Sequence, residues 1–196
     1  MRRLAYTELP ATTISLARYL LGKVVVRETS QGLLTGRIVE TEAYLQGDTA
    51  CHAFRGLTPR NRSLFLRRGH AYVYIAYGTS LMLNVASAAE GAGEGVLIRA
   101  LEPIDGIAPM RETRGVTRLL DLTRGPGRLA QAMGVNLSLD GVDLCASGPL
   151  WLGADGKRRG EIGESTRIGL TKDADRVLRF YIRGNPFVSG PKRLNL

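Results

Sequence analysis

The chain has 196 residues, 44% of them hydrophobic, with a mean hydropathy of -0.05 and a formal net charge of +9 at pH 7. This composition predicts one globular domain over residues 1–196 and excludes a disordered or membrane-spanning chain. The two cysteines, Cys51 and Cys145, form neither a disulfide framework nor a metal motif, and no apolar leader follows the first arginines, so we expect a reduced, cytoplasmic protein.

The first predicted element is a helix at 11–22, which a threonine can cap and Gly22 can end. Two strands follow at 23–29 and 33–45, and a short turn joins them into a hairpin. Residues 46–70 are rich in Gly, Arg and Asn and predict a long loop.

A second predicted hairpin has strands at 70–78 and 79–87, with Gly78 at its tip. A fifth strand, at 94–103, should stop at Pro103. The remaining elements are helices at 104–114 and 126–133, a surface loop at 153–160 and a last strand at 176–184. Strands outnumber helical crossovers, so we expect an α+β fold: a single domain with a mostly antiparallel, curved sheet flanked by helices, and a protruding β-hairpin.

A stretch without any Asp or Glu runs from Thr49 to Ala89, although a solvated face usually mixes both charges. It carries the arginines Arg55, Arg60, Arg62, Arg67 and Arg68. Arginine forks suit phosphates, while a basic proteome or arginine-rich coding would give the same bias. We expect this surface to meet nucleic acid, with Arg55, Arg60 and Arg62 binding DNA.

The segment RIVETEAY carries two carboxylates on one predicted strand. Alternation places Ile38, Glu40, Glu42 and Tyr44 on one face, with the carboxylates about 7 Å apart. A carboxylate between apolar and aromatic groups can serve as a general base. The alternative is an edge strand with a wet face, and alternation does not choose between the two glutamates.

The second predicted hairpin carries Tyr72, Tyr74 and Tyr77. Tyr72 and Tyr74 share a face, and aromatic residues in strands usually belong to the core. Tyr77, at the tip, has no core to enter and could wedge between base pairs. Tyr44, Tyr74 and His52 could then stack against an extruded base.

Several other chemistries lack their motifs. The segment GAGEG at 91–95 does not have the spacing of a phosphate-binding loop, and CHAFRG offers only two adjacent metal-ligand candidates. Nothing has the form of a nucleophile elbow. We therefore expect no metal and no organic cofactor.

Taken in order, the motifs resemble the alkyladenine (3-methyladenine) DNA glycosylase family, of the mammalian type rather than the helix-hairpin-helix type. They are LLGK, RIVETEAY, ACHAFRGLTPRNR, AYVYIAYG, LN at 83–84, VLIRALEP, GPGRLAQAMG and RFYIRGNPFVS. The resemblance covers nearly the whole chain. The spacing between Tyr44 and His52 is one residue shorter than in mammalian members, which could reshape the rim of the pocket.

The resemblance implies catalytic roles for three residues. Glu42, the second acid of VETEAY, matches the general base of the family. Arg99, in VLIRALEP, matches an arginine near the attacking water. The backbone carbonyl of Ile168, in TRIGL, matches the other partner of that water.

The resemblance also implies a base pocket. Tyr44, His52 and Tyr74 match its stacking walls. Asn84 matches the asparagine used against the guanine 2-amino group. Tyr77 matches the side chain that fills the gap left by the flipped nucleotide.

The implied function is a monofunctional DNA glycosylase of base excision repair, without lyase activity. It would bind double-stranded DNA as a monomer, associated with the nucleoid in the cytoplasm. It would hydrolyse the glycosidic bond of alkylated or deaminated purines with an activated water. None of the four lysines lies between Arg37 and Arg99, which disfavours an amine nucleophile. Two alternatives remain open: a non-catalytic nucleic-acid-binding module, and another hydrolase using Glu40 and Glu42 as an acid/base pair.

Overall fold

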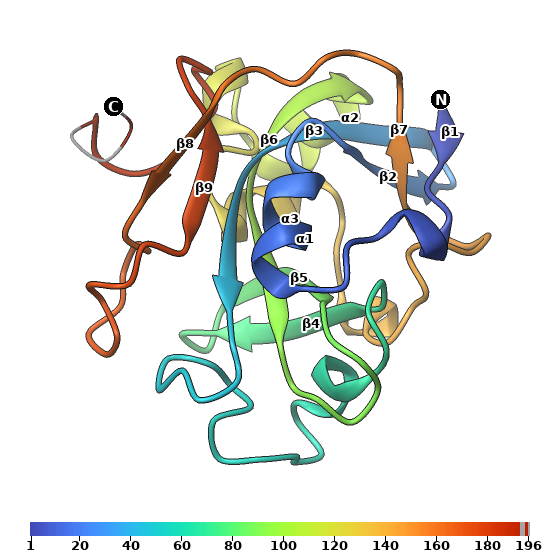
Figure 1. Ribbon diagram of the computed structural model, residues 1–196. Helices are drawn as coiled ribbons and strands as arrows, with labels where there is room; N and C mark the ends of the chain where they lie inside the picture. The colour runs from blue at the N-terminus through green and yellow to red at the C-terminus, as the bar shows by residue number, and fades with distance from the viewer. Residues whose placement is uncertain (193–194, 196) are drawn as a thin grey trace.

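The computed structural model describes residues 1–192 and 195; residues 193, 194 and 196, part of the predicted domain, lie outside the described residues. The chain folds as an open sheet with helices packed against it (Figure 1). The strands are β1 (Arg2–Arg3), β2 (Val24–Thr29), β3 (Gly32–Tyr44), β4 (Ala71–Ala76), β5 (Ser80–Ala86), β6 (Gly95–Asp105), β7 (Leu150–Ala154), β8 (Ile162–Ser165) and β9 (Arg179–Ile182). The α-helices are α1 (Thr13–Leu20), α2 (Ile107–Arg114) and α3 (Pro126–Ala132), and the 3-10 helices are η1 (Tyr6–Glu8), η2 (Arg62–Phe65), η3 (Leu119–Asp121) and η4 (Leu137–Leu139).

The strand order is β1-β7-β2-β3-β6-β5-β4, with β9 joined to β3 and β8 joined to β9. Every strand pair between the described residues is antiparallel. The predicted α+β fold with a mostly antiparallel sheet, flanking helices and a hairpin is thereby confirmed.

Strand β3 is the centre of the sheet. Its first half pairs with β2, its second half pairs with β9, and β6 runs along its other edge. Glu40 is therefore flanked by Ala100 on one side and Tyr181 on the other. The register of β3 and β6 shifts on both sides of Glu40, and such bulges re-aim side chains. The alternative of an edge strand with a wet face is wrong.

The helices cover apolar side chains of the sheet. Thr12 caps α1 by accepting a hydrogen bond from the Ser15 amide, as predicted for a threonine. One face of α1 buries Leu16 and Leu20 against β3 and β6, which supply Ile38, Ile98 and Leu101 to the same core. Helix α3 packs on β5 and β6, beginning at a proline in the first turn.

Two predicted boundaries around Pro103 are wrong. Strand β6 continues to Asp105, so α2 begins at Ile107 rather than at residue 104. A proline is tolerated there because the register of β3 and β6 shifts beside it, where Pro103 faces Gly36.

Three strands were not predicted: β1, β7 and β8. Strand β7 includes Gly153 and Ala154, which were predicted to belong to a surface loop at 153–160. It pairs with β1 and β2. Its residues Leu150, Trp151 and Leu152 are all buried, so they lack the apolar-polar alternation that identifies a strand from sequence. The last strand, β9, is shorter than the expected 176–184.

The β4–β5 hairpin turns at Tyr77 and Gly78, as predicted. Both residues have positive φ, 52° and 75°, and the Thr79 amide donates to the Ala76 carbonyl. This is the pattern of a type I′ turn, which matches the twist of the strands. Glycine adopts it freely, whereas an aromatic residue with positive φ is strained.

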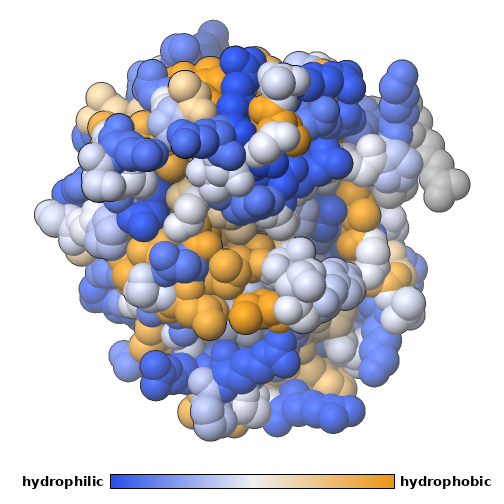
Figure 2. Space-filling view, turned by 180° about the vertical axis from the view of Figure 1, so that it is seen from behind, coloured by the Kyte–Doolittle hydropathy of each residue, from blue (hydrophilic) through white to orange (hydrophobic). Residues whose placement is uncertain are grey.

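The face of the molecule in Figure 2 is largely hydrophilic and includes an apolar area bordered by hydrophilic groups. Among the described residues, no helix has the length and apolar character needed to span a bilayer.

Candidate active site

A cavity of about 480 Å³ lies where β3 to β6 meet the loops around residues 50–60 and 168–170. It brings together eight residues predicted for the site: Tyr44, His52, Arg60, Tyr74, Tyr77, Asn84, Arg99 and Ile168. Residues so far apart in sequence meet because β3, β4, β5 and β6 are neighbours in the sheet.

Aromatic rings form one wall of this cavity. The His52 and Tyr74 rings meet edge to face with centroids 4.3 Å apart, and Tyr72 stacks on Tyr74 at 5.3 Å. The His52 Nδ1 atom lies 2.8 Å from the Tyr72 hydroxyl oxygen. Tyr72 was not predicted as a site residue, although strand alternation had already placed it beside Tyr74. The Asn61 side chain supports this wall by donating to the His52 carbonyl.

The aromatic groups of the cavity are held in their neutral forms. Burial raises the pKa of Tyr74 to about 12, and it also raises the pKa of Tyr44. Burial, assisted by the charge of Arg60, lowers the pKa of His52. At neutral pH, these side chains offer uncharged rings to a ligand.

Asn84 lies on β5 and is buried at the cavity. Its side-chain nitrogen donates to the Tyr72 carbonyl at 3.1 Å. This bond crosses between the two strands of the hairpin, because Asn84 pairs with Tyr72 in register. The orientation of the amide is therefore held by the sheet.

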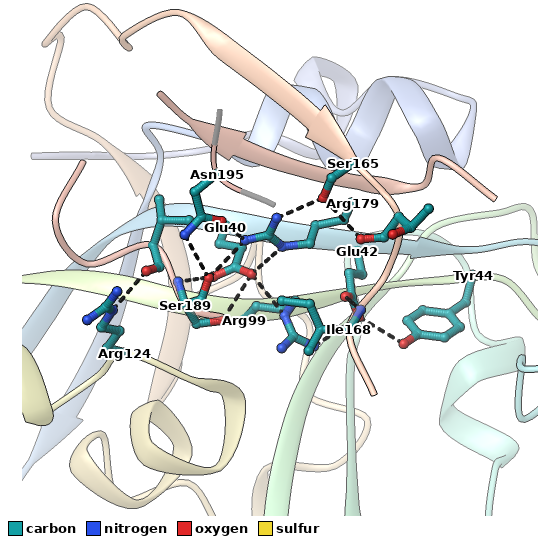
Figure 3. A network of polar contacts seen from close by, with 12 residues as sticks. Glu40, Glu42, Tyr44, Arg99, Arg124, Ser165, Ile168, Arg179, Ser189 and Asn195 are labelled. Carbon is teal, nitrogen blue, oxygen red and sulfur yellow. Dashed lines mark hydrogen bonds and ion pairs between the residues drawn. The ribbon is translucent and has the colours of Figure 1, made fainter. Parts of the chain in front are cut away.

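Glu42 lies directly behind the cavity wall and has no exposed surface. Its carboxylate accepts hydrogen bonds from the Ile168 amide at 2.7 Å, the Tyr44 hydroxyl at 3.0 Å and Arg99 Nη1 at 3.1 Å (Figure 3). All three partners line the cavity. Ile168 thus contacts the carboxylate through its backbone nitrogen; the predicted role of its carbonyl oxygen stays a prediction.

Glu40, two residues earlier on β3, belongs to the same network (Figure 3). It accepts from Arg99 Nε at 3.0 Å, from Arg179 Nε at 2.6 Å, and from both the amide and the hydroxyl of Ser189 at 2.6 and 3.0 Å. Arg99 therefore bridges the two glutamates, which alternation had placed on one face.

The two carboxylates have opposite pKa shifts. Burial raises the pKa of Glu42 above its ordinary value, against the opposing effect of Arg99 and the two other donors. Burial alone would also raise the pKa of Glu40, but Arg99 and Arg179 together lower it. A carboxylate with a raised pKa takes up a proton more readily, and this property distinguishes Glu42 from Glu40.

The predicted DNA-binding arginines are separated. Arg60 lines the cavity and donates to the Ile75 carbonyl at 2.8 Å. Arg55 and Arg60 both line a neighbouring cavity of about 310 Å³, together with Phe54 and Lys172. Arg62 is exposed at the start of η2 and, among the residues that the structure describes, belongs to the lining of neither cavity.

Sequence reasoning missed a buried ion pair beside the site. Arg167 makes a two-pronged contact with Asp48, and both side chains are fully buried. The Arg167 guanidinium also lies 4.6 Å from the centroid of the Tyr44 ring. The sequence offered one signal for Arg167: it directly precedes Ile168, a predicted site residue, in the TRIGL segment.

Comparison with known proteins gives the class of this protein first. Residues 7–186 match the methylpurine-DNA glycosylase family. The protein is therefore a DNA glycosylase, a hydrolase of DNA repair whose partner is DNA.

Its relatives agree over almost the whole chain. A protein of Mesorhizobium japonicum is 66% identical over 191 residues, covering 97% of this chain and 92% of the relative. A protein of Paraburkholderia phytofirmans is 48% identical over 187 residues, covering 95% and 88%. One from Methanoculleus marisnigri is 45% identical over 181 residues, covering 90% and 93%. All three are provisionally named 3-methyladenine DNA glycosylase. The chain belongs to the methylpurine-DNA glycosylase family, as the sequence motifs predicted.

Proposed function

We propose that this protein, acting as a single domain over residues 1–196, flips alkylated or deaminated purines out of duplex DNA and hydrolyses their N-glycosidic bond. Its substrates include 3-methyladenine, 7-methylguanine, hypoxanthine and ethenoadenine. The observation that carries the proposal is a buried carboxylate, with a raised pKa, directly behind an aromatic cavity. A cavity of this size accommodates a small aromatic ligand such as a purine.

The flipped base stacks within the aromatic cavity. Tyr44, His52 and Tyr74 offer neutral rings, which stack on a planar base without regard to its sequence context. Asn84, which lines the cavity, opposes the exocyclic 2-amino group of an undamaged guanine. Its bond to Tyr72 supports this role, because a tethered amide cannot turn away from the clash.

Glu42 accepts the proton of the attacking water. The water oxygen forms a bond to C1′ while the bond from C1′ to the purine nitrogen breaks, and the purine leaves with the bonding electrons. Arg99 helps to hold the water, and the Glu42 carboxylate stabilises the positive charge that develops on the sugar. Because Glu42 has no exposed surface, water reaches it only when one of its contacts with Arg99, Tyr44 or Ile168 opens.

The duplex lies across the mouth of the cavity, and the protein acts on it as a monomer. Arg55, Arg60 and Arg62 are exposed on the surface of the acid-free stretch, where they meet phosphates. Tyr77 occupies the space of the extruded nucleotide; its 86% exposure at the hairpin tip and its place in the cavity lining support this role.

Tyr77→Ala is expected to reduce the fraction of flipped lesion, while initial binding to DNA changes little. The reason is that the ring would fill the gap in the base stack, whereas arginines supply the encounter. A fluorescent base analogue beside the lesion reports the flipped fraction. Tyr19→Ala, on α1, is an aromatic control outside both the cavity and the acid-free stretch. An unchanged flipping equilibrium in Tyr77→Ala would contradict the wedge role.

The enzyme is expected to be monofunctional, leaving an intact abasic site. Strand-cutting glycosylases attack C1′ with an amine, but none of the four lysines, all within the described residues, lines the main cavity. Borohydride trapping with a lesion duplex, and gels run before and after alkali, test this. A covalent adduct, or breaks formed without alkali, would refute the water mechanism and direct attention to Lys172 in the neighbouring cavity.

The proposed function as a whole is tested by incubating the protein with duplexes that each carry one lesion. Release of the damaged base is the expected result. Tight lesion binding without base release from any duplex would instead support the non-catalytic binding module. Release that depends on both Glu40 and Glu42 as proton carriers would favour the other hydrolase.

A further inference from the structure

The Asp48–Arg167 ion pair joins two segments that each lead to cavity residues and that lie far apart in the sequence. Asp48 lies four residues before His52, in the loop that follows β3. Arg167 lies in the segment between β8 and β9, next to Ile168. Both carboxylate oxygens of Asp48 meet the guanidinium, and neither side chain is exposed.

Further contacts hold the same two segments together. Arg167 donates to the Ala43 carbonyl at 3.1 Å and to the Asp173 carbonyl at 3.2 Å. The Asp173 carboxylate accepts from the amide and the hydroxyl of Thr49, at 2.7 and 2.5 Å. The segment that carries Ile168 is therefore fixed to the loop that leads to His52.

Arg167 also lies next to two groups that contact Glu42, the Tyr44 side chain and the Ile168 amide. Its guanidinium carbon lies 4.6 Å from the centroid of the Tyr44 ring, which lines the cavity. The next residue, Ile168, donates its amide to the Glu42 carboxylate at 2.7 Å. One buried arginine thus contacts the Tyr44 ring and directly precedes the residue whose amide donates to the Glu42 carboxylate.

We propose that Arg167, held by Asp48, is a positioning residue for base excision: it places the Tyr44 ring and the Ile168 amide against Glu42. The inference rests on the proposed function. This positioning role needs a planar side chain that forms two parallel hydrogen bonds. A lysine can neither bind both carboxylate oxygens in one plane nor stack flat on a ring. Small displacements of catalytic groups lower reaction rates strongly.

The test compares Arg167→Lys with Arg37→Lys. Arg37 makes the same kind of fork with Asp155, at 3.1 and 2.7 Å, and neither residue lines either cavity formed by the described residues. Single-turnover excision with saturating enzyme is measured against pH, and unfolding by denaturant is followed in parallel. Asp48→Asn serves as a second variant in which the charge but not the shape is lost.

Arg167→Lys is expected to lower the maximal single-turnover rate about 10-fold or more. The pH below which the excision rate falls should also be higher than in the parent. The reason is that a displaced Ile168 amide no longer stabilises the ionised form of Glu42, which raises its pKa further. Arg99, Tyr44 and Glu40, the other groups facing Glu42, are unchanged. Asp48→Asn should shift both quantities in the same direction, whereas Arg37→Lys should keep the parent rate and pH profile.

A merely structural role predicts a different result. If Arg167→Lys and Asp48→Asn lost stability but kept the parent rate and pH profile, as expected of Arg37→Lys, the positioning role would be overturned while the proposed function stood. If the parent released no base, or if Glu42→Gln released it as fast as the parent, the proposed function would fall and the inference with it.

Discussion

Glu42→Gln is expected to abolish base release while leaving lesion binding largely intact. Glutamine keeps the shape of the side chain and can still meet Arg99 and the Ile168 amide, but it cannot take up a proton. The loss should be on the order of 10²–10⁴-fold or more, as for other general bases. Single-turnover excision and equilibrium binding to a lesion duplex measure the two effects separately. Excision within a few-fold of the parent rate would show that Glu42 is not the base.

The pH profile of the parent supplies an internal check on the same residue. Glu42 must be ionised to accept a proton, and its pKa is raised by burial. Excision should therefore be full above this raised pKa and fall as the pH drops through it, at a pH above the value of about 4.3 for an ordinary glutamate. Glu42→Gln should remove this acidic limb together with the rate.

Glu40→Gln is expected to lower the free energy of unfolding by about 3–5 kcal/mol, the usual cost of breaking a buried ion pair from one side. Glu40 and Glu42 balance the charges of Arg99 and Arg179, and neutralising Glu40 leaves a buried positive charge. Both Glu40 oxygens accept hydrogen bonds, so the amide nitrogen of glutamine would face a donor.

The same substitution two residues apart on β3 should thus have opposite consequences. The folded state lowers the pKa of Glu40, so the ionised group contributes stability that is present above its unfolded pKa and is lost as the pH falls. The folded state raises the pKa of Glu42, and Glu42 pairs with one arginine where Glu40 pairs with two, so neutralising Glu42 should cost less stability than neutralising Glu40. Denaturant unfolding at neutral pH compares the variants. A larger loss in Glu42→Gln than in Glu40→Gln would contradict this assignment.

Excision by the folded Glu40→Gln protein should be much less affected than excision by Glu42→Gln. Glu40 contacts Arg99, but Glu40 itself is not part of the cavity lining that the described residues form. Stabilising conditions, such as low temperature, keep the variant folded for this comparison. The reverse ranking of the two rates would mean that Glu40 is the base.

The sequence by itself determined the family, the α+β class, both hairpins and most of the residues around the cavity. Short-range patterns carry this information: alternation placed Glu40 with Glu42 and Tyr72 with Tyr74, and Gly78 marked the turn, where the structure gives it a φ of 75°. Ordered motifs then assigned the roles that alternation left open. Boundaries near Pro103 and the buried strand β7 were missed, because a bulge and two-sided burial leave no periodic signal.

The tertiary structure alone showed which arginines pair with Asp48 and Glu40. Asp48 meets Arg167 across 119 residues, and Glu40 meets Arg179 across 139. Such pairs follow from strand register and loop packing, not from local spacing. The pKa contrast between the two glutamates has the same origin: both are fully buried, and Arg179 reaches Glu40 because β9 pairs with the second half of β3. A buried carboxylate takes its proton affinity from the charges that folding brings around it, and no stretch of sequence contains that environment.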